Sequence, residues 1–118
     1  MKKKILITDD DVDLQGIFKF IFEKEGYEVE LLGEADSIFE NKYNIPDLFL
    51  LDRQLNGYDG LNVCKFLKEQ SATKDIPVIM VSASPGLSQL ALKAGANDFI
   101  EKPFEKKSLL EIVSRCID

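Results

Sequence analysis

The feature of this chain that most restricts its fold is the alternation of two hydrophobic periods. Short apolar runs typical of strands occupy residues 5–8, 27–32, 47–51, 77–81 and 97–100. After each run, apolar residues recur every three or four positions, as they do along one face of a helix. Strands that alternate with helices form a parallel sheet with right-handed crossovers. We therefore predict one doubly wound α/β domain, (βα)5, over residues 1–118.

The predicted helices are marked by their apolar stripes and by residues typical of helix ends. Gly26 and Gly95 each follow a stripe and are suited to the position after a helix. Ser84 followed by Pro85 predicts the start of the fourth helix, because serine caps helices and proline fits the first helical position. We interpret Asp11 and Asp13 as acids of a solvated first helical turn, where they suit the helix dipole.

Composition excludes several classes of function. The chain has 118 residues, of which 45% are hydrophobic, enough for the core of one domain. Its net charge of −6 and its scattered lysines argue against direct binding of nucleic acid. It has no histidine, which rules out an imidazole base or a histidine-ligated metal. The apolar runs are too short for membrane insertion and no export signal is evident, so we expect a cytoplasmic location.

Polar residues stand where the predicted strands end. Asp9 and Asp10 follow the first strand, Asp52 the third, Ser82 the fourth and Lys102 the fifth. In an open α/β sheet, ligands bind beyond the carboxyl ends of the strands. An isolated Asp-Asp pair would be interpreted as a helix cap, but together with the later residues it favours a charged pocket.

Such a pocket needs compensating positive charge. Two carboxylates about 4 Å apart repel by about 4 kcal/mol at an effective dielectric near 20. Lys102 offsets one charge, and a hard divalent cation would offset the rest. Carboxylate, carbonyl and water ligands suit Mg²⁺, with Mn²⁺ as an alternative. Beside such an ion, Asp52 could act as a nucleophile toward a phosphoryl group.

Four segments together resemble the receiver domain of two-component response regulators, of the chemotaxis single-domain type. They are ILITDD at residues 5–10, LLDRQLNGYDG at 50–60, VSA at 81–83 and FIEKPF at 99–104. The four motifs follow one another in the same order as in that family, each at the end of the corresponding predicted strand. The resemblance extends from residue 5 to the last helix. It implies a flavodoxin-like strand order, 2-1-3-4-5.

The resemblance also implies roles for the acidic residues. Asp52 corresponds to the phosphoryl acceptor. Asp10 and Asp52 would ligate Mg²⁺ directly, together with the backbone carbonyl of Gln54, and Asp9 would act through a metal-bound water.

Roles for the remaining motif residues are implied in the same way. The hydroxyl of Ser82 and the backbone N–H of Ala83 would bind phosphoryl oxygens, and Lys102 would form an ion pair with them. The Lys102–Pro103 peptide bond is expected to be cis. Phe99 would be the switch aromatic residue that turns inward when Ser82 moves toward the phosphate.

Three features depart from the common family pattern. Asn56 stands where proline is frequent, although Asn followed by Gly57 still suits a turn. Phe99 lacks the hydroxyl of the more usual tyrosine. The segment at residues 84–94 is about one turn shorter than in many relatives, which affects the start of the fourth helix.

The function implied is a signalling switch and not an enzyme, since it catalyses only its own phosphorylation and dephosphorylation. A sensor histidine kinase or a histidine phosphotransfer protein would donate the phosphoryl group. The surface of the fourth helix, fifth strand and fifth helix would then control an unknown partner protein. The short tail after Ile117 favours a stand-alone regulator over a receiver excised from a longer protein.

Two other functions compete with this interpretation. A phosphatase of the haloacid-dehalogenase type also uses an aspartyl nucleophile, but it needs a second carboxylate two residues later, where Gln54 stands. A flavodoxin-like redox protein needs a phosphate-binding loop after the first strand, and Asp9, Asp10 and Asp11 would repel phosphate there.

Overall fold

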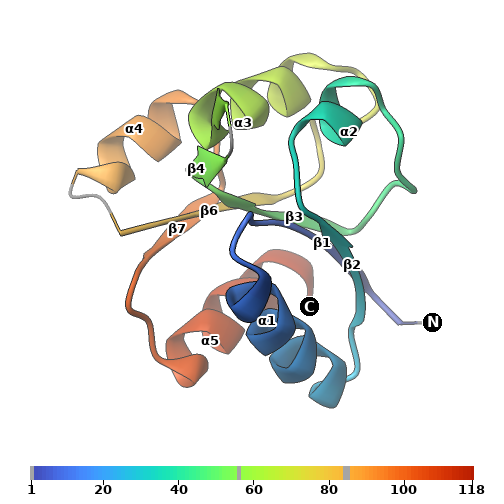
Figure 1. The fold of residues 1–118 in the computed structure, drawn as a ribbon, viewed down its shortest axis with the longest axis vertical. Coiled ribbons are helices and arrows are strands. Elements are labelled where there is room, and N and C mark those ends of the chain that lie inside the picture. The colour runs from blue at the N-terminus through green and yellow to red at the C-terminus, as the bar shows by residue number, and fades with distance from the viewer. Residues whose placement is uncertain (1, 56, 84–85) are drawn as a thin grey trace.

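A parallel five-stranded sheet forms the centre of the molecule (Figure 1). The computed structural model describes residues 2–55, 57–83 and 86–118. The strand order is β2-β1-β3-β6-β7, and every neighbouring pair is parallel. This confirms the predicted doubly wound sheet and its order 2-1-3-4-5. The strands are β1 Lys4–Thr8, β2 Glu28–Leu32, β3 Leu48–Asp52, β6 Val78–Ser82 and β7 Asp98–Glu101.

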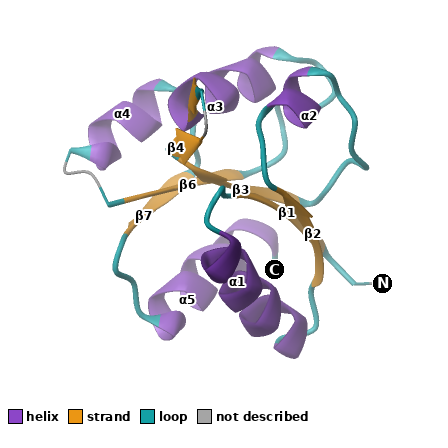
Figure 2. Ribbon diagram, in the orientation of Figure 1, coloured by secondary structure: helices purple, strands orange, loops and turns teal. Residues whose placement is uncertain are grey.

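Helices cover both faces of the sheet (Figure 2). One face carries α1 and α5, and the other carries α2, α3 and α4. The predicted helix start at Ser84 and Pro85 lies outside the described residues, and α4 begins at Leu87 in the part that is described. The helices are α1 Val12–Lys24, α2 Asp36–Phe39, α3 Gly60–Glu69, α4 Leu87–Lys93 and α5 Lys106–Ile117.

The sheet separates two hydrophobic cores. Successive side chains of a strand point to opposite faces, so Leu6 packs in the core on the α2–α4 side. Its neighbours Ile5 and Ile7 pack in the core on the α1–α5 side. All five residues of β3 and all five of β6 are buried, as expected for central strands covered on both faces.

Asp11 is the N-cap of α1, which corrects our interpretation of it as an acid of the solvated first turn. Its carboxylate Oδ1 accepts from the backbone N–H groups of Asp13 at 3.0 Å and of Leu14 at 3.1 Å. These N–H groups have no partner within the helix, so the cap stabilises its first turn. Of the three acids after β1, Asp11 thus caps α1, whereas Asp9 and Asp10 take no part in the cap.

A small antiparallel hairpin follows the central strand and was not predicted. It consists of β4 Gln54–Leu55 and β5 Tyr58–Asp59. Strands of two residues are too short to show a hydrophobic period, which explains why the sequence did not reveal them. The turn predicted at Asn56 lies outside the described residues, and the adjacent Gly57 has a φ of 78°. The hairpin carries the chain back from the end of β3 to the start of α3.

Candidate functional site

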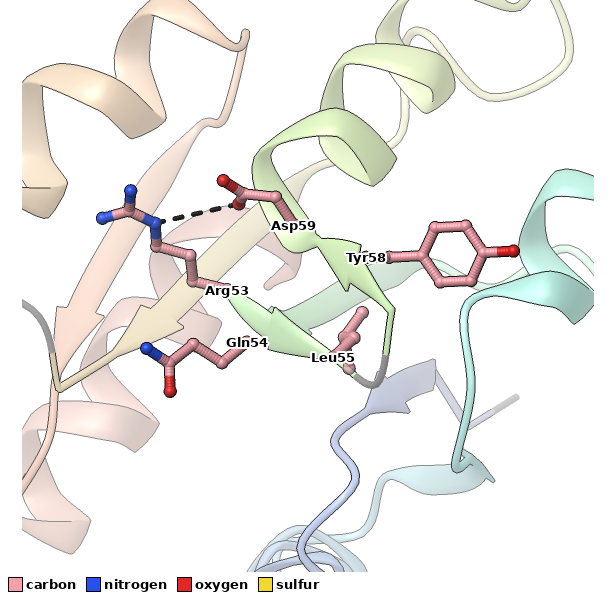
Figure 3. A pocket seen from close by; sticks show the side chains of 5 residues that line it. All are labelled: Arg53, Gln54, Leu55, Tyr58 and Asp59. Atoms are coloured by element: carbon pink, nitrogen blue, oxygen red, sulfur yellow. Dashed lines mark ion pairs between the residues drawn. The ribbon is translucent and has the colours of Figure 1, made fainter.

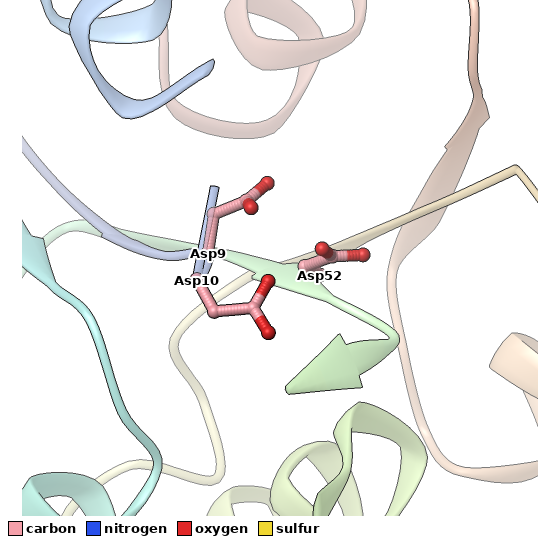
Figure 4. A group of neighbouring side chains, drawn as sticks. All are labelled: Asp9, Asp10 and Asp52. Carbon is pink, nitrogen blue, oxygen red and sulfur yellow. The ribbon is translucent and has the colours of Figure 1, made fainter. Parts of the chain in front are cut away.

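Three carboxylates meet at the carboxyl ends of β1 and β3 (Figure 4). Asp9 follows β1 directly and is 1% exposed, and Asp52 is the last residue of β3 and is 6% exposed. Asp10 is exposed. One carboxylate oxygen from each residue lies within 4.8 Å of the others. The strand ends therefore bring together the three acids that the sequence placed at this edge.

Lys102 is the cation of this cluster. Its Nζ lies 3.3 Å from Oδ2 of Asp52 and 3.5 Å from Oδ2 of Asp9. Its backbone N–H donates to the carbonyl oxygen of Ser82 at 2.9 Å, which extends the β6–β7 pairing past the end of β7. The Lys102–Pro103 peptide bond is cis. One ammonium faces three carboxylates, so the cluster keeps excess negative charge.

Burial, together with this excess negative charge, raises the pKa of Asp52 from its ordinary 3.8 to about 6. The largest cause is burial, and the second is the negative charge of Asp9. Lys102 and the backbone N–H of Gln54 oppose the rise, the latter by donating to Oδ1 of Asp52 at 3.3 Å. At neutral pH the Asp52 carboxylate is therefore ionised, and its charge lowers the stability of the folded state.

The protein without divalent cations is expected to become more stable as pH falls from about 7.5 toward 5. The pKa of Asp52 is higher in the folded protein than in the unfolded chain, so the folded state binds the proton more readily in this window. Between about pH 7.5 and pH 5, protonation should restore about 1.4 kcal/mol of stability, because the pH then lies about one unit below the folded pKa of about 6. Urea unfolding in a chelator at several pH values measures this. Asp52→Asn is the control, and parallel profiles for the two proteins would contradict the prediction.

The donor set of this cluster fits a hard divalent cation. Carboxylate oxygens are the ligands that Mg²⁺ prefers, and its retained waters can fill the remaining positions. Asp10 contributes an exposed carboxylate on the open side of the cluster, while Asp9 and Asp52 contribute buried ones. A cation here would offset the charge that raises the pKa of Asp52.

The other residues singled out from the sequence lie around this cluster. Ser82 ends β6 and is 1% exposed, and Ala83 follows it and is exposed. Gln54 begins β4 with an exposed side chain. Phe99 lies in β7 opposite Met80, is half-buried, and packs against the core on the α2–α4 side.

Gly60 allows the close packing of α3 against the end of β3, a role that sequence reasoning missed. A Cβ at this position would lie 2.1 Å from the carbonyl oxygen of Asp52 and 2.8 Å from Cα of Arg53. The backbone N–H of Gly60 donates to the carbonyl oxygen of Arg53 at 2.5 Å. The N-terminus of α3 can thus approach the end of β3 only because residue 60 has no side chain. The Asp-Gly step in the sequence was the available signal, but we interpreted it only as a turn and helix start.

The hairpin also lines an open pocket beside the end of β3, with a volume of about 530 Å³ (Figure 3). Nε of Arg53 lies 3.7 Å from Oδ1 of Asp59, and the same carboxylate caps α3 by accepting from the N–H of Leu61 at 2.9 Å. The side chain of Tyr58 points to the other side of the hairpin, toward α2, and its hydroxyl donates to Asp36. Side-chain hydrogen bonds of Tyr58 and Asp59 thus connect the hairpin to α2 and to α3.

Fold and site together define a flavodoxin-like α/β domain with an acidic site at the carboxyl ends of its strands. A family model described as the response regulator receiver domain matches residues 5–114. The chain belongs to this family.

Individual relatives agree with this assignment. The chain is 36% identical over 114 residues to the phosphate regulon transcriptional regulatory protein PhoB of Escherichia coli, covering 93% of this chain and 49% of PhoB. It is 33% identical over 113 residues to the DNA-binding response regulator MtrA of Mycobacterium tuberculosis, covering 93% of this chain and 48% of MtrA. The chain thus spans about half the length of these curated relatives.

Solved structures give the same result. A putative response regulator from Chloroflexus aurantiacus superposes with a TM-score of 0.93 at 29% identity, covering 99% of this chain and 98% of that one. Within the described residues, none of the helices has the length and apolar character needed to cross a bilayer.

Proposed function

We propose that this domain is a phosphorylation switch whose phosphoryl acceptor is Asp52. The observation that carries the proposal is the burial of this carboxylate at the end of the central strand, within 4.8 Å of two other acids and 3.3 Å from Lys102. A buried, ionised oxygen beside a cation is suited to attack phosphorus. The phosphoryl donor would be a sensor histidine kinase or a histidine phosphotransfer protein, as the family membership suggests.

We further propose that the acidic cluster holds Mg²⁺, with Mn²⁺ as a substitute. Asp10, Asp52 and the backbone carbonyl of Gln54 would be direct ligands, and Asp9 would act through a water. When bound, the ion would screen the negative charge of the acids and of the incoming phosphoryl group. Its presence would also lower the pKa of Asp52 and keep the nucleophile ionised.

The transfer itself needs few groups from the chain. A carboxylate oxygen of Asp52 forms a bond to phosphorus while the phosphorus–nitrogen bond of the donor phosphohistidine breaks, and the electron pair stays on the donor imidazole. Lys102, already between two carboxylates, would pair with phosphoryl oxygens. The hydroxyl of Ser82 and the N–H of Ala83 would bind the other oxygens. Slow attack by water on the acyl phosphate would reset the switch.

The output surface that we propose consists of α4, β7 and α5. Phosphorylation would draw Ser82 toward the phosphate and let Phe99 turn inward, and so shift an equilibrium between two surface states. Leu90 and Leu92 on α4 are 39% and 61% exposed and would contribute apolar contacts to an output partner. We propose that this partner is a protein and that the chain does not bind nucleic acid directly.

Intact mass after incubation with acetyl phosphate tests the proposal. We expect a gain of one phosphoryl group that requires Mg²⁺ and is lost in base, as an acyl phosphate should be. No gain from acetyl phosphate or from a panel of phosphorylated histidine phosphotransfer proteins would refute the switch. Sustained turnover of a chromogenic phosphomonoester would instead favour the aspartyl phosphatase.

Lys102→Ala is expected to bind Mg²⁺ at least as tightly as the wild type at a pH of about 8, where Asp52 remains ionised. The substitution removes a cation that competes for the same two carboxylates. Calorimetric titration with Mg²⁺ measures the affinity, and Lys93→Ala at the end of α4 is the matched control. A large loss of affinity confined to Lys102→Ala would contradict the charge argument.

A further inference from the structure

Gln15 contacts the acidic loop after β1 in two ways. Its backbone N–H donates to the carbonyl oxygen of Asp11 at 3.0 Å, within the first turn of α1. Its side-chain Nε2 donates to the carbonyl oxygen of Asp9. One residue thereby holds the backbone carbonyls of the residues on both sides of Asp10.

The backbone at Asp10 matters because little else restrains this residue. Its side chain is exposed, and among the described residues it accepts none of the hydrogen bonds found at the site. The neighbouring acids are fixed, since Asp9 accepts the N–H of Asp11 at 2.9 Å and Asp11 caps α1. The direction of the Asp10 carboxylate therefore depends on the conformation of the backbone that carries it.

The position of Gln15 suits this task. The residue is half-buried, and its amide reaches toward the loop after β2. A Cβ placed on Gly33 in that loop would lie 3.7 Å from Nε2 of Gln15, an ordinary contact distance. The amide therefore lies between α1, the acidic loop and the end of β2, where neighbouring atoms limit its rotamers.

We propose that Gln15 is a positioning residue for the divalent cation. It holds the backbone on both sides of Asp10 so that this carboxylate faces those of Asp9 and Asp52 before the ion binds. Without that restraint, mutual repulsion would turn the exposed carboxylate away, and ion binding would have to reorder it. Gln15 acts through Asp10 and does not touch the ion. This inference rests on the proposed function of the same site.

Gln15→Met tests the proposal, because methionine has similar length and helix propensity but cannot donate a hydrogen bond. Calorimetric titration with Mg²⁺ should give a dissociation constant about tenfold higher than that of the wild type, as for other residues that orient metal ligands. Thermal unfolding in a chelator should be close to that of the wild type. Gln89→Met, on the exposed face of α4, is the matched control and should bind Mg²⁺ like the wild type.

Nuclear magnetic resonance gives a readout that needs no variant. The side-chain amide protons of Gln15 should exchange with solvent more slowly than those of the exposed Gln89. Equal exchange, or an unchanged dissociation constant in Gln15→Met, would overturn the proposal while leaving the function of the site intact. Absence of Mg²⁺ binding in the wild type would instead overturn the proposed metal site itself, and this proposal with it.

Discussion

Asp52→Asn is expected to abolish phosphoryl labelling, with a loss of at least about 100-fold. The amide keeps the size of the side chain but removes the ionised oxygen that would attack phosphorus. It also removes a buried negative charge, so the variant should fold and be no less stable than the wild type at neutral pH without Mg²⁺. Intact mass after incubation with acetyl phosphate and Mg²⁺ measures the labelling.

The control for this variant is Asp75→Asn, which removes an exposed carboxylate before β6, on the amino-terminal side of that strand. It should be labelled as fully as the wild type. Full labelling of Asp52→Asn would show that another residue accepts the phosphoryl group. In that case, peptide mapping after trapping of the acyl phosphate would identify the acceptor.

Gly60→Ala is expected to destabilise the protein by about 3 kcal/mol, a large effect for a single added methyl group. The new Cβ would lie 2.1 Å from the carbonyl oxygen of Asp52, and this backbone cannot move without displacing Asp52 itself. Labelling should fall as well, because the carboxylate must stay close to its two acidic neighbours and Lys102. Urea unfolding gives the free energy, and the initial rate of labelling gives the second effect.

Gly16→Ala makes the matched comparison. Gly16 lies on α1, and nothing comes within 4 Å of a Cβ built there. Alanine in an open helical position should stabilise the protein by about 0.5–1 kcal/mol. If the two substitutions have similar effects, the close approach at Gly60 does not matter for folding.

Much of the fold and the acidic cluster could be predicted from the sequence. Periodicity identified the five parallel strands and the helices between them, and topology then required Asp9, Asp52 and Lys102 to meet at one edge. The strand order came from the family resemblance. Each of these predictions rests on a repeated pattern or on a general property of parallel sheets, so the loss of a single signal would not have changed the result.

The features that the sequence did not reveal depend on single contacts. The β4–β5 hairpin has strands too short for a hydrophobic period. The role of Gly60 depends on a distance between two backbone segments, and that of Gln15 depends on where its side chain reaches. A glycine or a glutamine looks the same in a sequence whether or not such a contact exists. Only the three-dimensional arrangement of the chain distinguishes these residues from others of the same type.

The separation of the two hydrophobic cores has a consequence for how substitutions combine. A change such as Leu87→Ala on the α4 side and one such as Val113→Ala on the α5 side share no core neighbours, since each side chain packs in a different cluster. Their effects on stability should therefore be additive to within about 0.5 kcal/mol. Core residues on one face of the sheet can therefore change with little effect on the packing of the core on the other face.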